Sequence, residues 1–119
     1  MKLINSFSDA ADQLITVVLD DGSIAQMEFI YRAGIQRWFF NLNHPLITLN
    51  GYGITQGPNL LRQWRNIIPF GILVRAIDFI DPIQANDFQS GRVLLYILDE
   101  TEVQTIEQLV FAPPVLANA

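Results

Sequence analysis

The chain has 119 residues, half of them hydrophobic and only 16% charged, and its formal net charge is −5. An average globular chain carries about 25% charged residues, so we expect part of this apolar excess to be buried against a partner, with a tightly closed barrel as the alternative. The negative charge argues against a surface that neutralises phosphates, and hence against sequence-specific nucleic-acid binding. The absence of cysteine excludes disulfides and thiolate metal sites.

Neither a signal peptide nor a membrane span is expected. Residues 1–6 turn polar too early for the core of a signal peptide. The longest apolar run, Ile67–Val74, contains Pro69 and Gly71, whereas a membrane span needs about 20 apolar residues. We therefore expect a single soluble domain over residues 1–119, synthesised in the cytoplasm.

The clearest structural signal lies in the stretch Leu14–Leu42, where three runs rich in β-branched and aromatic residues are separated by two short turns that contain glycine. Apolar and polar residues alternate along the second and third runs, which predicts an antiparallel meander with one buried face. The side chains expected on that face are Ala25, Met27, Phe29, Tyr31, Trp38, Phe40 and Leu42.

Three more strands are expected beyond the meander, so that the core spans about residues 14–98. Glycines 51 and 53 predict a bulge or bend in the fourth strand, and the sixth strand is apolar on both faces, which indicates a central position. We thus expect an all-β fold, a six-stranded antiparallel barrel or sandwich. The elements, in chain order, are a lead-in or helical turn over 1–13, the meander, a strand over Leu46–Ile54, a short helix or tucked loop around Leu60–Trp64, a strand over Ile72–Phe79, a loop over Asp81–Gly91 that ends in a glycine of positive φ, and a strand over Arg92–Leu98.

A short C-terminal helix and an extended tail are expected over residues 99–119. Thr101 to Gln104 match the capping box that starts a helix. Pro113 and Pro114 lack the backbone donors needed to continue it. The tail is uncharged and apolar, and we predict that Pro113, Pro114, Val115 and Leu116 dock on a partner.

No set of residues predicts catalysis or a cofactor. His44, the only histidine, precedes a proline and is interpreted as a surface turn residue. Asp78, Asp81 and Asp87 could surround a calcium ion, but they lack the alternation of a calcium loop, and ordinary turn chemistry explains them better. An enzyme would have to assemble its active site from these four residues, and we expect none.

Arg62, Trp64 and Arg65 form the one basic and aromatic cluster. A nucleobase could stack on the tryptophan, but two arginines in an acidic chain attract phosphates poorly. We favour a role in which Trp64 plugs the edge of the core and the arginines meet acidic groups, and we count this cluster among the candidate partner-binding residues.

With the strands laid out, the chain resembles the phage baseplate plug family, typified by a baseplate protein of a contractile-tailed cyanophage. The resemblance runs from about Leu14 to Tyr96, and its motifs are Arg37-Trp38, Leu49-Asn50-Gly51, Pro69-Phe70-Gly71-Ile72-Leu73 and Asp87-Phe88-Gln89-Ser90-Gly91-Arg92-Val93-Leu94-Leu95-Tyr96.

This resemblance implies a structural component of the virion near the tail tube axis, which helps to close the end of the tube until contraction. Its partners would be hub, tube, spike or wedge proteins, with self-association as a further expectation and no cofactor. The alternative is a small barrel that binds an apolar ligand in an interior lined by Trp38, Phe40, Phe29 and Tyr31.

Overall fold

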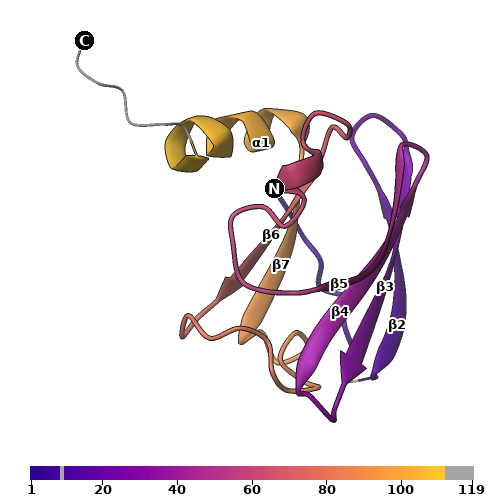
Figure 1. Cartoon of the computed structure of the whole chain (residues 1–119), viewed down its shortest axis with the longest axis vertical. Coiled ribbons are helices and arrows are strands. Elements are labelled where there is room, and N and C mark those ends of the chain that lie inside the picture. The colour runs from indigo at the N-terminus through magenta and orange to yellow at the C-terminus, as the bar shows by residue number, and fades with distance from the viewer. Residues whose placement is uncertain (9, 112–119) are drawn as a thin grey trace.

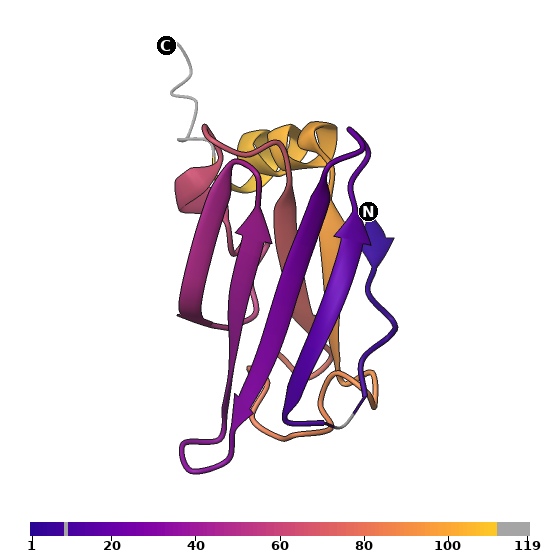
Figure 2. The same ribbon diagram turned by 90° about the vertical axis from the view of Figure 1, so that its right-hand side faces the viewer.

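The computed structural model describes residues 1–8 and 10–111 and shows two antiparallel sheets packed face to face (Figures 1 and 2). The four-stranded sheet has the order β2 (Asp12–Val18), β3 (Ile24–Arg32), β4 (Arg37–His44) and β5 (Ile47–Gly53). The three-stranded sheet has the order β1 (Lys2–Leu3), β7 (Val93–Leu98) and β6 (Gly71–Ala76). The helical segments are η1 (Arg62–Trp64), α1 (Glu100–Ile106) and η2 (Glu107–Phe111), which continues α1 with π-helical geometry.

The meander is confirmed, and so is its buried face. In the antiparallel register Phe29 faces Phe40 and Tyr31 faces Trp38, which brings the predicted apolar side chains together on one side of the sheet. Of these residues only Tyr31 is partly exposed. They pack against the inward side chains of β6 and β7 in a common core.

The fold is a sandwich rather than a closed barrel. Among the described residues, no strand of one sheet is hydrogen-bonded to a strand of the other. The two inner faces meet instead through side chains, as in a β-sandwich. The predicted all-β class is therefore confirmed, and of the two predicted architectures the sandwich is the one adopted.

The lead-in expected over residues 1–13 is wrong in part, because β1 adds a seventh strand within the described residues. Lys2 pairs with Ile97 and Leu3 with Tyr96, and the N–H of Ile4 donates to the carbonyl of Leu95 at 2.9 Å. A strand of two residues is too short to show a period in the sequence. With β1 on one side and β6 on the other, β7 is central, as its two apolar faces predicted.

The bend expected in the fourth strand is present. The register between β4 and β5 shifts between Phe40 and Leu42, and Gly51 has a φ of 74°. The N–H of Gly51 donates to the Asn41 side chain at 2.7 Å. A left-handed glycine at a shift of register is typical of a β-bulge.

Gly91 also has positive φ, 82°, as predicted for the residue that closes the long loop. A Cβ there would meet no atom within 4 Å, so a side chain would strain the backbone without displacing a neighbour. We expect Gly91→Val to lower the free energy of unfolding by about 1–3 kcal/mol in urea titrations.

Gly34 is the matched control for this substitution. It has an equally open Cβ position but no positive φ, so Gly34→Val should change stability by less than about 0.5 kcal/mol. Equal losses for the two variants would contradict the argument from backbone conformation.

The C-terminal helix exists, but its predicted start is wrong. Asp99, not Thr101, is the N-cap: its carboxylate accepts the N–H of Glu102 at 2.8 Å, while the Glu102 carboxylate accepts the N–H of Asp99 at 3.0 Å. This reciprocal pair satisfies two N–H groups that the helix leaves unpaired. Thr101 lies inside the helix, where its carbonyl accepts the hydroxyl of Thr105.

Helical geometry continues to Phe111, short of Pro113. The tail over 113–119, with its predicted docking residues, lies outside the described residues. Within residues 1–8 and 10–111, no helix has the length and apolar character needed to span a bilayer.

Candidate functional site

The predicted cluster of Arg62, Trp64 and Arg65 lies on η1 and the residue that follows it. The ring of Trp64 is half-buried against the core and meets Tyr52 edge to face, with 5.1 Å between ring centroids. The two arginines approach Glu107 of η2, with Nε–Oε1 distances of 3.3 Å for Arg65 and 4.0 Å for Arg62. Trp64 thus plugs the core edge, and the acidic group that meets the arginines belongs to the same chain.

These contacts connect η1 to η2. A second ion pair, between the Met1 amino group and Glu102, connects the N-terminus of the chain to the other end of the helical segment, in α1. Both connections involve partly exposed groups, whose ion pairs contribute little to stability. The residues that form these ion pairs belong to segments that lie together at one end of the sandwich, where η1, α1 and η2 meet (Figure 1).

The interpretation of His44 as a surface turn residue is wrong, because its side chain is buried. The N–H of Leu46 donates to Nδ1 at 3.1 Å, and Nε2 lies 2.9 Å from the Ser23 hydroxyl. An Nδ1 that accepts leaves the proton of a neutral ring on Nε2. The alternation of β4, which places residues 38, 40 and 42 inward, places residue 44 inward as well.

His44 does not form a catalytic triad with Ser23 and Asp21. In a triad the imidazole lies between the hydroxyl and the carboxylate, where it removes the hydroxyl proton. Here the serine lies in the middle, because its hydroxyl also donates to Asp21. The proton of the serine therefore points to the carboxylate, and the imidazole has no proton to remove.

Asp78, Asp81 and Asp87, the three aspartates that could surround a calcium ion, belong to a hydrogen-bond network around Arg92. The side chain of this arginine makes five hydrogen bonds of 2.6–3.0 Å, which matches the five donors of a guanidinium. Its partners are both carboxylate oxygens of Asp87, a carboxylate oxygen of Asp78, and the carbonyls of Ile80 and Asp81. In the described part of the chain, no group of three or more histidines and acids could hold a metal ion.

Asp87 is the buried centre of this network, with 2% of its side chain exposed. It also accepts the N–H groups of Ile83 at 2.7 Å and Gln84 at 2.8 Å. Burial alone would raise the pKa of Asp87, but hydrogen bonds from Arg92, Gln84 and Ile83 outweigh it and hold the pKa below its ordinary value. The same bonds to Asp87 raise the pKa of Arg92.

The sequence reasoning did not find this network. It grouped the aspartates correctly but assigned Arg92 only to the start of a strand. An acid followed five residues later by an arginine is common at a loop end and gives no signal of burial. Only the fold shows that the arginine points back into its own loop.

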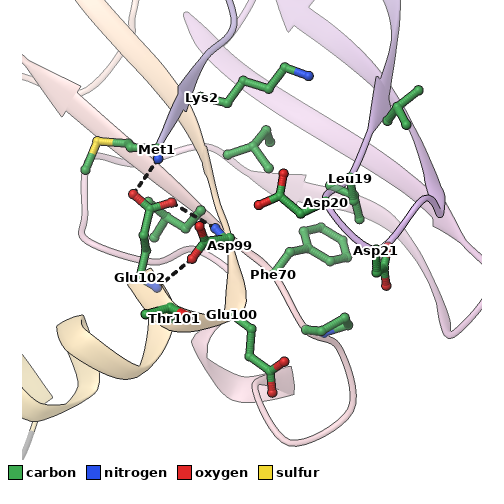
Figure 3. A pocket seen from close by; sticks show the side chains of 14 residues that line it. Met1, Lys2, Leu19, Asp20, Asp21, Phe70, Asp99, Glu100, Thr101 and Glu102 are labelled. Carbon is green, nitrogen blue, oxygen red and sulfur yellow. Dashed lines mark hydrogen bonds and ion pairs between the residues drawn. The ribbon is translucent and has the colours of Figure 1, made fainter.

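A pocket of about 430 Å³ lies at the helical end of the sandwich (Figure 3). It is bounded by the turn between β2 and β3, by Phe70, and by the junction of β7 with α1, and its carboxylates outnumber its cationic groups. The charged residues that line it are Lys2, Asp20, Asp21, Asp99, Glu100 and Glu102, together with the amino group of Met1. Apolar side chains such as Val18, Leu19 and Phe70 also line the pocket, and its excess of carboxylates does not suit a phosphate.

The residues proposed for an apolar ligand site line no part of this pocket. Trp38 packs edge to face on Phe88, with centroids 5.4 Å apart, and Phe29 packs in the same way on Phe7 at 4.9 Å. The sandwich interior around them is filled by other rings. This packing argues against a ligand-binding interior.

Comparison with known families identifies the chain. No curated protein matches it. The family model described as the cyanophage baseplate Pam3 plug gp18 matches residues 1–100. The match spans both sheets and ends at the first residue of α1. The chain therefore belongs to the cyanophage baseplate plug family.

Proposed function

We propose that this protein is a structural component of a contractile-tailed phage baseplate, located near the tail tube axis and associated with the hub, where it helps to close the end of the tube until contraction. The family match over residues 1–100 carries this proposal. The expected partners are hub, tube, spike or wedge proteins, with self-association as a further expectation. We expect the chain to be synthesised in the host cytoplasm and to act in the virion, without enzymatic activity.

The physical properties of the sandwich support a static role. Both inner faces are filled with apolar side chains, and each end is held by a polar network, around Arg92 at one end and at the start of α1 at the other. A closely packed interior resists deformation. The net charge of −5 also suits a surface beside the path of DNA, because carboxylates repel phosphates.

We further propose that Arg62, Trp64 and Arg65, together with the tail, face a neighbouring baseplate protein. The contacts with Glu107 place η2, the last described element, beside η1. The tail follows η2 in the chain, so these two candidate surfaces start from the same end of the sandwich. An Arg and a Trp on one surface are residue types enriched in interface hot spots.

Mass spectrometry of purified virions tests the proposed function. Phage particles should contain this chain. Particles of a phage from which the gene for this chain has been deleted should lack a complete baseplate or leak DNA. Restoration by the wild-type chain supplied in trans is the control. Absence of the chain from intact, infectious virions would overturn the proposal.

Deletion of residues 113–119 is expected to abolish incorporation into the baseplate while leaving the melting temperature unchanged. Val115 and Leu116 are the sizeable apolar groups of this tail, and burying both against a partner could contribute roughly 3–6 kcal/mol before ordering costs. Thermal melting and recovery in purified particles are the measurements.

The matched control deletes only residues 117–119, which keeps the proline pair and both apolar side chains. This shorter deletion should assemble normally. A lower melting temperature for the longer deletion would place the tail in the core, and normal assembly would leave it without a docking role.

A further inference from the structure

The first part of the loop that joins β6 to β7, residues 77–80, exposes three apolar side chains, while backbone carbonyls of the same loop and the carboxylate of Asp87 turn inward to Arg92. Ile77, Phe79 and Ile80 are 70%, 79% and 51% exposed. The predicted strand over Ile72–Phe79 was too long: β6 ends at Ala76, so these residues belong to the loop. An exposed apolar group is unremarkable when single, but three within four residues form a patch.

The inward polar groups fix this patch in place. Arg92 binds the carboxylate of Asp78 at 2.7 Å and the carbonyls of Ile80 and Asp81 at 3.0 Å each. From the connection between β5 and η1, the N–H of Gln56 donates to the Asp81 carboxylate at 2.9 Å, and its side chain donates to the carbonyl of Phe79. The loop backbone on both sides of Phe79 is therefore held by side chains.

Phe79 itself has a φ of 61°. Bulky residues rarely adopt this left-handed conformation, which is strained for any residue with a Cβ. Asp78 stabilises it locally by accepting the N–H of Ile80 at 3.1 Å. With 79% of its surface exposed, the phenyl ring gains little from packing in return. A strained residue that points an aromatic ring into solvent is typical of a functional position.

We propose that Ile77, Phe79 and Ile80 form an apolar anchor that inserts into an apolar hollow on another baseplate protein. This inference rests on the proposed baseplate role. The hydrogen bonds of Arg92 and Gln56 hold the anchor in its binding conformation before contact, which reduces the entropy lost on binding. Beside Phe79 lies a shallow groove, lined also by Pro58, Val74 and Arg75, which extends the contact surface.

A different protein fits this anchor better than a second copy does. The pocket of about 430 Å³ in this chain is lined by five carboxylates beside its apolar side chains, and a second copy that inserted Phe79 there would bring Asp78 and Asp81 close to those like charges. Two copies, each with a net charge of −5, would also repel each other.

A membrane is likewise a poor match. Bacterial membranes are anionic, and Asp78 and Asp81 flank Phe79 in the sequence. The favoured partner is thus a protein surface with an apolar hollow and with hydrogen-bond donors at its rim, which would face the half-exposed carboxylate of Asp78.

The substitution Phe79→Asn tests the anchor without damaging the fold, because asparagine tolerates left-handed backbone conformations. Its melting temperature should stay the same or rise by about 2–5 °C, while its incorporation into purified virions falls at least about tenfold. Leu46→Asn is the control: Leu46 is 56% exposed in the turn between β4 and β5 and should incorporate normally. Wild-type incorporation by Phe79→Asn would overturn the inference and leave the proposed function intact, whereas absence of the wild-type chain from virions would overturn both.

Photo-crosslinking identifies what covers the anchor. With p-benzoylphenylalanine at position 79, assembled particles should yield an adduct to a different baseplate protein. An adduct only to a second copy of this chain would overturn the proposal, as would the absence of any adduct. Flotation of the wild-type chain, but not of Phe79→Asn, with phosphatidylglycerol–phosphatidylethanolamine vesicles would also overturn it in favour of a membrane.

Discussion

Trp38→Ala is expected to lower the free energy of unfolding by about 3–5 kcal/mol, enough to unfold a domain of this size at physiological temperature. The indole is fully buried. It packs on Phe88 and Tyr31, and its Nε1–H donates to the carbonyl of Gln84 at 3.0 Å. The substitution therefore leaves a cavity and removes one of the two hydrogen bonds that the Gln84 carbonyl accepts, where the other donor is the N–H of Asp87 at 3.2 Å. This is the point where the long loop meets the four-stranded sheet.

Chemical denaturation followed by circular dichroism measures this loss. The matched control is Phe39→Ala, the neighbouring aromatic residue on the opposite face of β4, which is only partly buried and lies against the guanidinium of Arg32 at 5.7 Å. Phe39→Ala should cost about 1 kcal/mol. A loss below 1 kcal/mol for Trp38→Ala would show that the faces of this strand are assigned in reverse.

The features predicted correctly from sequence all depend on local regularities. The period of two along β3 and β4 identified the side of the sheet to which Trp38 belongs, because successive side chains of a strand point to opposite faces. The glycine at the end of the long loop identified a position of positive φ. The two apolar faces of β7 indicated its central place. Each of these signals is contained in a few consecutive residues, so it can be recognised in a single sequence.

The features that were missed depend on contacts between distant segments. β1 exists only because β7 offers it an edge to pair with, and a two-residue strand has no pattern of its own. The start of α1 was placed at Thr101 because the motif matched there, although Asp99 and Glu102 satisfy the same chemistry two residues earlier. The choice between barrel and sandwich depends on which strand edges meet, which alternation does not encode.

The candidate sites were predicted less completely than the fold. Arg62, Trp64 and Arg65 were grouped because they are neighbours in sequence, whereas Glu107, which faces the arginines, lies more than forty residues later. The exposed apolar segment over residues 77–80 was missed because a run of isoleucine and phenylalanine after β6 reads as more strand. Only the position of Arg92 shows that the carbonyls of Ile80 and Asp81 and the carboxylate of Asp87 turn inward.

Asp87→Asn is expected to lower the free energy of unfolding at pH 7 by about 2–4 kcal/mol, because it leaves Arg92 without its principal buried counter-charge. Asp87 is 2% exposed and Arg92 is 24% exposed. Asparagine also supplies an N–H₂ group where Asp87 accepts the backbone N–H groups of Ile83 and Gln84. Asp78→Asn is the control: the Asp78 side chain is 45% exposed, so its removal should cost less than about 1 kcal/mol.

The pH dependence separates the charge of Asp87 from its packing. Its pKa in the folded protein lies below the ordinary value of 3.8, since hydrogen bonds from Arg92 and the backbone outweigh the cost of burial. A carboxyl whose pKa is lowered by folding contributes its full stabilisation above that ordinary value and loses it as the pH falls through the folded pKa. The difference in stability between wild type and Asp87→Asn should therefore be constant from pH 5 to 7 and shrink below about pH 3.8. A difference that does not shrink in acid would mean that Asp87 stabilises the loop by shape alone. In that case the hydrogen bonds from Arg92 to Asp78 and to the carbonyls of Ile80 and Asp81 would hold Phe79 in its strained, outward position, independently of the charge of Asp87.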